Sequence, residues 1–175
     1  MLSVDHKLLG ASSNQVEESV PALVYPYRAG LTGGALGGIA MAAVAIMYGI
    51  LSGRGIWLPI NLIGATLIRD LQGASLATLS QFNADALIAA LFLHIAISIG
   101  LGLVFALLLP TLPGSPVVWS LAIGWLLWLL ASLIVQLLNP IMVATVDVPS
   151  LWLAHLAYGL ALGRWIARTP KIRVE

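Results

Sequence analysis

Long stretches without any charged residue dominate the pattern of hydrophobic and polar positions along the chain. No charge lies between Arg28 and Arg54, and none lies between Asp85 and Asp147. The second stretch is too long for one helix and is interrupted at 110–116, where prolines and a glycine favour a turn. About 20 apolar residues, rising 1.5 Å each, cross the hydrocarbon core of a bilayer. The pattern therefore predicts transmembrane helices at about 30–51, 86–109 and 117–138.

A fourth apolar stretch predicts a further span at about 149–167, although it contains Arg164. A long cationic side chain near a helix end can extend to the lipid headgroups, so the span is retained. The predicted fold class is all-α, an integral-membrane bundle of four transmembrane helices. This membrane domain occupies 29–168, between an N-terminal tail at 1–28 and a C-terminal tail at 169–175.

The segment 53–85, between the first two spans, has a mixed character. Its apolar run at 56–68 is too short to cross a membrane, and polar residues follow it. We therefore predict an interfacial or re-entrant segment on the non-cytoplasmic face. Asn83 and Asp85 suit the start of the next helix, where a capping side chain and a negative charge are favourable.

Composition supports lipid rather than water as the main surrounding of the chain. Hydrophobic residues make up 60% and charged residues 9% of the 175 positions, whereas a soluble domain is about one quarter charged. The net charge of +1 leaves no basic patch suited to a nucleic-acid backbone. The absence of cysteine excludes disulfides and thiolate metal sites. The first 20 residues contain no apolar core of signal-peptide length, so we expect no cleaved export signal.

The distribution of Lys and Arg predicts the orientation of the helices. The side that holds both termini carries six of these residues: Lys7, Arg28, Arg164, Arg168, Lys171 and Arg173. The other side carries only Arg54 and Arg69, which are candidates for holding a lipid phosphate there. We therefore expect a multi-pass protein of the cytoplasmic membrane with both termini in the cytoplasm.

The two halves of the chain resemble each other. The run Asn61–Thr66 follows the first span, and the similar run Asn139–Thr145 follows the third. Two sets of residues with i, i+4, i+8 spacing then occupy one helical face each: His94, Ser98 and Gly102 in the second span, and His155, Gly159 and Gly163 in the fourth. We interpret the chain as a tandem repeat of two-helix hairpins, with the halves parallel in the membrane.

Glycines form two rows on the first span, where small residues let helices approach closely in lipid. The rows contain Gly30, Gly34 and Gly38, and Gly33 and Gly37; Gly102, Gly159 and Gly163 occupy other spans. A phosphate-binding glycine loop is excluded because no strand precedes the first row and no Lys-Ser/Thr pair follows it. These glycines are therefore predicted to pack helices.

His94 and His155 are the candidate functional pair, because ionisable residues inside a membrane are often functional. Their predicted depths match, so a pseudo-twofold axis could bring them together as axial ligands of haem b. No other feature of the sequence specifies a haem cavity. We favour structural histidines that donate hydrogen bonds and need no cofactor, with haem b or contact with a proton path or quinol as alternatives.

Three amides lie near the predicted non-cytoplasmic edge: Asn61, Gln136 and Asn139. They could bind an ion or a substrate, but we favour a role in satisfying the irregular backbone around Pro59 and Pro140.

No catalytic or metal motif is present in the sequence: it has no HExxH, no Ser/His/Asp set in register and no carboxylate pair inside a span. Trp125 and Trp128 lie in the middle of a span, unlike aromatic residues at a membrane interface. We predict that they pack against a neighbouring helix.

Three features carry a resemblance to a known family: the glycine-rich first span, the run Trp-Leu-Pro-Ile-Asn-Leu-Ile-Gly-Ala at 57–65, and the run His-Leu-Ala-Tyr-Gly-Leu-Ala-Leu-Gly at 155–163. Together they resemble a family of uncharacterised small bacterial four-helix membrane proteins, over about 30–166. The resemblance implies a bacterial inner membrane and no enzyme activity. In overall character the chain is also similar to accessory membrane subunits of quinol-oxidising complexes such as alternative complex III.

Three functions follow as hypotheses. The first is a non-catalytic accessory subunit of a respiratory or photosynthetic electron-transfer complex, which packs against larger membrane subunits and lipids. The second is a b-type haem protein with His94 and His155 as ligands. The third is a small transporter or channel, since parallel repeats occur in transporters.

Overall fold

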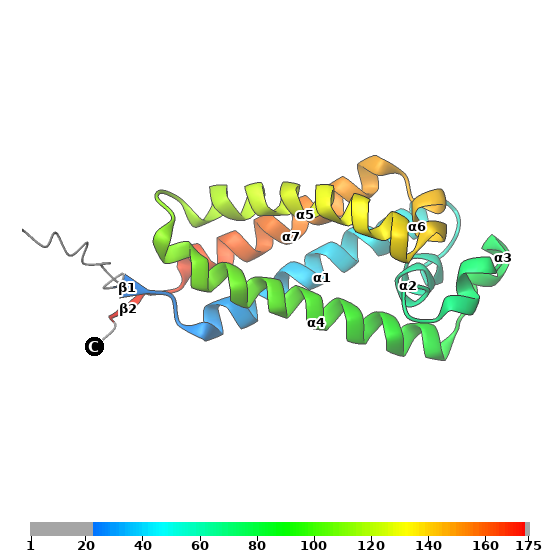
Figure 1. Cartoon of the computed structure of the whole chain (residues 1–175), viewed down its shortest axis with the longest axis horizontal. Coiled ribbons are helices and arrows are strands. Elements are labelled where there is room, and N and C mark those ends of the chain that lie inside the picture. The colour runs from blue at the N-terminus through cyan, green and yellow to red at the C-terminus, as the bar shows by residue number, and fades with distance from the viewer. Residues whose placement is uncertain (1–22, 174–175) are drawn as a thin grey trace, which may run out of the picture.

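The computed structural model describes residues 23–173, and this part of the chain is mostly helical. Four long helices run side by side in Figure 1: α1 (Tyr27–Leu51), α4 (Ala84–Leu108), α5 (Pro116–Leu138) and α7 (Val148–Arg168). The shorter elements are α2 (Trp57–Gly64), η1 (Arg69–Gly73), α3 (Leu76–Leu79), η2 (Leu109–Thr111) and α6 (Pro140–Thr145).

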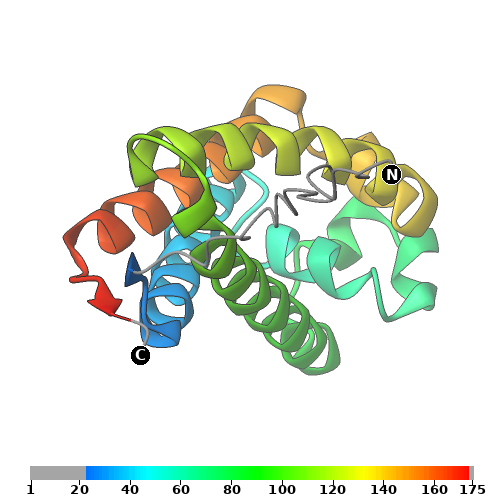
Figure 2. The same ribbon diagram turned by 60° about the vertical axis from the view of Figure 1, so that its left-hand side comes forward.

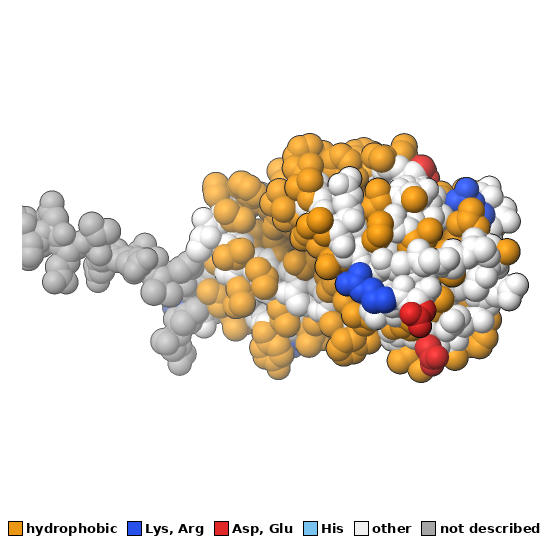
Figure 3. All heavy atoms as spheres, turned by 45° about the vertical axis from the view of Figure 1, so that its right-hand side comes forward, with side chains coloured by type: hydrophobic (Ala, Val, Ile, Leu, Met, Phe, Trp, Pro, Cys, Tyr) orange, Lys and Arg blue, Asp and Glu red, His pale blue; other side chains and the backbone are white. Residues whose placement is uncertain are grey.

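Three of the long helices are long and apolar enough to span a membrane: α1, α4 together with η2, and α5. The prediction of a helical, multi-pass membrane protein is confirmed to this extent. The fourth long helix, α7, is less apolar because it carries Arg164, Arg168 and His155 among its 21 residues. The large apolar area that the helices expose is visible as the orange surface in Figure 3.

The helix starts follow from local capping chemistry. The Asn83 side chain accepts a hydrogen bond from the Ala86 amide at 2.9 Å, which confirms its predicted capping role at the start of α4. Asp147 caps α7 in the same way, by accepting from the Ser150 amide at 3.1 Å. The predicted turn before α5 contains Gly114, whose φ of 89° suits a residue without Cβ.

The long helices pack in the order α4–α1–α7–α5. Helix α1 contacts α4 and α7 extensively, and α5 contacts α7. Figure 2 shows α5 and α7 running together and α1 beside α4. The core of this arrangement contains Phe105 of α4 and Tyr158, Leu162 and Ile166 of α7, all nearly inaccessible to solvent.

The segment 53–85 folds against the bundle as α2, η1 and α3 at the end opposite the termini. Leu58 and Leu62 of α2 are fully buried, in a cluster with Leu79 and Ala86. Helix α2 packs on α4, and α6 lies beside it (Figure 1). The acidic residues of the described range (Asp70, Asp85 and Asp147) belong to elements at this end. Charged side chains gather at this end in Figure 3, whereas the surfaces of the long helices are mostly apolar. The predicted segment is therefore a small packed unit, with part of its apolar residues buried against protein and part, such as Phe82, exposed.

The two tails meet in a short antiparallel pair that the all-α prediction did not include. Strand β1 (Leu23–Val24) pairs with β2 (Ile172–Arg173), at the end of the bundle where α1 begins and α7 ends. The Lys171 ammonium lies 5.2 Å from the centre of the Tyr25 ring. This pair joins the start of α1 to the end of α7. The rest of the predicted N-terminal tail, including Lys7, lies outside the described residues.

Candidate functional site

The glycines predicted to pack helices line three helix contacts. Gly30, Gly34 and Gly38 face α4: a Cβ at Gly34 would lie 2.5 Å from the Ser98 carbonyl oxygen. Gly33 and Gly37 face α7, where a Cβ at Gly37 would lie 2.8 Å from the Tyr158 ring. The two rows of α1 therefore serve two different neighbours, which explains why this helix lies between α4 and α7.

The same close approach recurs between α5 and α7. A Cβ at Gly124 of α5 would lie 2.7 Å from the His155 carbonyl oxygen. A Cβ at Gly159 would meet the Ser120 carbonyl oxygen, and a Cβ at Gly163 would meet the Ser120 hydroxyl. The predicted Gly159 and Gly163, together with Gly124, which the prediction did not include, therefore let α5 and α7 approach closely.

His94 contacts α1 through a hydrogen bond. Its Nε2 atom lies 2.9 Å from the carbonyl oxygen of Gly38; because this oxygen can only accept, Nε2 carries a proton and donates to it. A carbonyl oxygen in a helix can accept a second hydrogen bond, and the missing side chain at Gly38 leaves room for the imidazole. This geometry fits the structural interpretation of His94.

His155 has a different partner. Its Nδ1 atom lies 2.8 Å from the Leu151 carbonyl oxygen, one turn earlier on α7. Its side chain is buried, and its backbone faces Gly124 of α5. One imidazole therefore bonds to α1 and the other to its own helix. Neither of these hydrogen bonds links the two rings, and axial ligation of haem b by this pair stays a hypothesis.

Tyr158 supplies a polar link between helices that the sequence did not indicate. Its hydroxyl donates to the Ser98 carbonyl oxygen at 2.7 Å, and the ring is 2% exposed. Ser98 lies one turn after His94 on α4, so α4 and α7 are connected next to the contact of His94 with α1. The only sequence signal was the position of Ser98 at i+4 from His94, on the same helical face.

A shallow apolar groove of about 380 Å³ borders His94 between α1 and α4. Ala35, Ala42, Leu91, Ile95 and Ile99 provide most of its lining. Its chemistry suits a hydrocarbon chain rather than an ion or a polar substrate, because the lining is almost entirely apolar.

Two of the three amides satisfy irregular backbone, as predicted. Asn61 donates through Nδ2 to the carbonyl oxygens of Leu79 and Gln81, at 2.8 and 2.7 Å. Asn139 donates to the Leu62 carbonyl oxygen at 2.6 Å and caps α6 through Oδ1. Both side chains are buried. These bonds join α2 to the loop before α4 and to the start of α6.

Gln136 and Trp125 are more exposed than the sequence suggested, whereas Trp128 is partly buried. Gln136 lies on the exposed face of α5. Trp125 is 51% exposed, so it does not pack fully against a neighbouring helix; its ring centre lies 6.1 Å from that of Trp128 on the same helix. Within residues 23–173, Trp125 stays half exposed, so its packing against a neighbouring helix stays a prediction that a helix of another subunit would have to meet.

Arg54 and Arg69, the predicted lipid-headgroup residues, both bond to backbone carbonyls. Arg54 donates to the Thr145 carbonyl oxygen at 3.1 Å, and Arg69 donates to the Leu138 carbonyl oxygen at 2.6 Å. Each bond ties the first half of the chain to the ends of α5 or α6. A lipid phosphate at these two residues stays a prediction.

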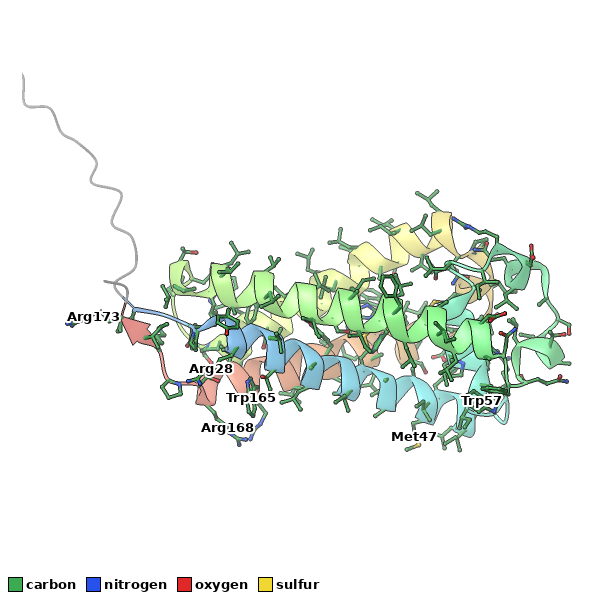
Figure 4. All side chains as sticks on the ribbon, turned by 90° about the horizontal axis from the view of Figure 1, so that it is seen from below. Arg28, Met47, Trp57, Trp165, Arg168 and Arg173 are labelled. Atoms are coloured by element: carbon green, nitrogen blue, oxygen red, sulfur yellow. The ribbon has the colours of Figure 1, made fainter. Side chains whose placement is uncertain are left out.

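Two arginines at the other end of the bundle line a cleft of about 340 Å³. Arg28 of α1 and Arg168 of α7 form its polar part, with Trp165 beside them. Figure 4 shows these three side chains together at the end of the helices that carries the chain termini. In the sequence, Arg28 and Arg168 indicate only the orientation of the helices. Because they are far apart in the chain, their position in one cleft could not be predicted.

Neither a metal centre nor a known relative adds to this description. Among residues 23–173, no group of three His, Cys, Asp or Glu side chains could hold a metal ion. The chain matches no protein-family model, no curated protein and no solved structure.

Proposed function

We propose that the chain is a non-catalytic accessory subunit of a bacterial electron-transfer complex, which packs against larger membrane subunits and lipids. The observation that carries the packing role is the surface of α5. Its only buried residues are Ser120 and Gly124, both on the side that faces α7. The other face exposes a continuous apolar surface: Trp125, Leu126, Leu129, Leu130, Leu133, Ile134, Leu137 and Leu138.

Lipid alone covers any apolar helix face, so the side chains of the α5 face must distinguish a protein partner from lipid. Trp125 lies in the middle of α5, far from either predicted interface, and its indole N–H has no water to bond to at that depth. Tryptophan is favoured at the interfaces between proteins. A neighbouring subunit that offers a hydrogen-bond acceptor would suit this position better than acyl chains do.

The same proposal includes four spans and two repeats. Helix α7 is 21 residues long and packs between α1 and α5, so it completes the bundle as a fourth span. The repeat is supported by equivalent contacts: Gly38 of α1 meets Ser98 and His94, and Gly124 of α5 meets their counterparts on α7. Gly34 precedes Gly38 by the same number of residues as Ser120 precedes Gly124, so the two pairs occupy equivalent positions on α1 and α5.

The orientation within the proposal follows from charge. Within residues 23–173, the end with the termini carries Arg28, Arg164, Arg168, Lys171 and Arg173, and the three acidic residues lie at the opposite end. A cytoplasmic location of the basic end agrees with the positive-inside rule. The electron-transfer complex itself, similar to alternative complex III, rests on the resemblance in overall character.

Purification in a gentle detergent, followed by mass spectrometry, tests the proposal. We expect larger membrane subunits of an electron-transfer complex to purify with the wild-type chain. Trp125→Ala should lower their yield, because it removes the largest side chain of the exposed α5 face. Phe92→Ala is the matched control: Phe92 is 69% exposed on α4, on the other side of the bundle. Purification of a folded chain without any partner would contradict the proposal, as would equal losses in the two variants.

A further inference from the structure

The cleft between the start of α1 and the end of α7 has the features of a phosphate-binding site at a membrane surface. Arg28 lies in the first turn of α1 and Arg168 in the last turn of α7, and both line the cleft. Their side chains are exposed, so the guanidinium groups can reach a bound anion. Arginine suits phosphate because its planar N–H donors match two oxygens at once.

The lining of the cleft combines charged and polar side chains with apolar ones. Ala29 and Thr32 form the α1 side, Trp165 the α7 side, and Thr169 and Pro170 the rim. Trp165 is 39% exposed and its indole is amphipathic, as is typical of residues at the level of lipid headgroups. A molecule that fills this cleft can therefore place a charged group between the arginines and an apolar part beside the tryptophan.

Electrostatics favours an anion here. Within residues 23–173, every charged residue at this end is a Lys or an Arg, and the three acidic residues of that range belong to the far end of the bundle. Anionic lipids attract such a basic surface by about 1 kcal/mol for each Lys or Arg near the membrane.

The cleft also has a fixed shape. Pairing of β1 with β2 holds the chain segments next to it, and the contact between Lys171 and Tyr25 lies in the same region. Thr169 donates to the Trp165 carbonyl oxygen at 3.1 Å, which shapes the turn that leaves α7. A preformed site loses less conformational entropy on binding.

We infer that Arg28 and Arg168 bind the phosphate of an anionic phospholipid, with Trp165 against the glycerol and upper acyl region. This inference rests on the proposed location of this end of the bundle at a membrane surface, and it does not depend on a partner complex. The two arginines come from the first and last long helices, so the bound phosphate would bridge α1 and α7 at their common end.

Lipid titration of the purified full-length chain tests the inference. The probes are short-chain phosphatidylglycerol, short-chain phosphatidylcholine and inorganic phosphate, and the bound lipid is counted by native mass spectrometry. We expect phosphatidylglycerol to bind at least about tenfold more tightly than the other two. Arg28→Gln and Arg168→Gln should each weaken its binding by about tenfold, which corresponds to 1.4 kcal/mol, close to one hydrogen bond to a charged group.

Arg164→Gln is the matched control, because it removes the same charge from the same helix at a position outside the lining of the cleft. Unchanged binding by this variant supports a specific site, whereas an equal loss would show a diffuse basic surface and overturn the inference. Binding of inorganic phosphate as tight as that of phosphatidylglycerol would overturn the assignment to lipid. Loss of lipid binding with retained partner subunits, or the reverse, distinguishes this inference from the proposed function.

Discussion

Replacement of Gly102 by alanine tests the closest contact between α1 and α4. A Cβ at this position would meet the Gly30 carbonyl oxygen and would lie 2.6 Å from the Gly34 Cα atom and 2.8 Å from the Gly34 nitrogen. All three atoms belong to the backbone of α1. Rotation of a side chain cannot relieve these contacts, so the two helices must move apart.

The distances set the size of the effect. Ordinary van der Waals contact begins at 3.4 Å, so the 2.6 Å contact requires a separation of about 0.8 Å, enough to lose a quarter to a half of the local dispersion energy. Overpacking of this kind costs about 1–3 kcal/mol. Alanine regains about 1 kcal/mol through its helix propensity. Because all three clashing atoms are backbone atoms of α1 that cannot rotate away, the cost lies at the upper end of this range, and we expect a net loss of about 2 kcal/mol in the free energy of unfolding.

Gly100 provides a matched control on the same helix. A Cβ at Gly100 would have no heavy atom within 4 Å, so Gly100→Ala gains the helix propensity without a clash. Equilibrium unfolding in mixed micelles, followed by circular dichroism, should show Gly102→Ala less stable and Gly100→Ala equal to or more stable than the wild type. Equal stabilities of the two variants would refute the reasoning, because the backbone contact would then contribute nothing.

Three further predictions concern buried polar groups. Tyr158→Phe should destabilise the chain by about 1 kcal/mol in the same unfolding assay, because it removes a buried hydrogen bond to a carbonyl of α4; Tyr27→Phe, at a ring that is 75% exposed, should change nothing. Asn139→Ala should cost about 2 kcal/mol, because it leaves a buried carbonyl without a donor and removes a helix cap; the exposed Gln136→Ala is its control, and equal effects would contradict the assigned role. The visible spectrum of the purified chain should lack a Soret band, since His94 and His155 bond to separate carbonyls; a band that disappears when either is changed to alanine would establish the haem hypothesis instead.

The sequence predicted the long helices well because their signals are local. The charge-free stretches, the turn at 110–116 and the cap at Asn83 all act within a few residues, and the helix bounds differ from the predicted spans by only a few positions. Asn61 and Asn139 do bond to backbone, as predicted, but Asn61 does so at Leu79 and Gln81, just before α4, and not around Pro59, which lies inside α2.

The choice of neighbours could not be read from the sequence. Glycine rows on α1 indicated close packing, but not that one row would meet α4 and the other α7. The matched positions of His94 and His155 suggested a shared site, yet the first ring bonds to α1 and the second to its own helix. The cleft of Arg28 and Arg168 was missed for the same reason, since it forms only when α1 and α7 lie together.

The order of the helices determines where a partner could bind. A closed pseudo-twofold bundle would pack α4 against α5 as extensively as α1 packs against α7, and both outer helices would then be covered. Instead the order is open, α4–α1–α7–α5, so each outer helix has one packed side (Figure 2). Helix α4 gains a second contact from α2, which buries Leu58 and Leu62 near its start. The corresponding piece of the second half, α6, has only six residues and none of them is buried. In the proposed repeat, the two halves therefore differ most in how they cover their outer helix. This difference leaves the exposed face of α5 for the neighbouring subunit that we propose.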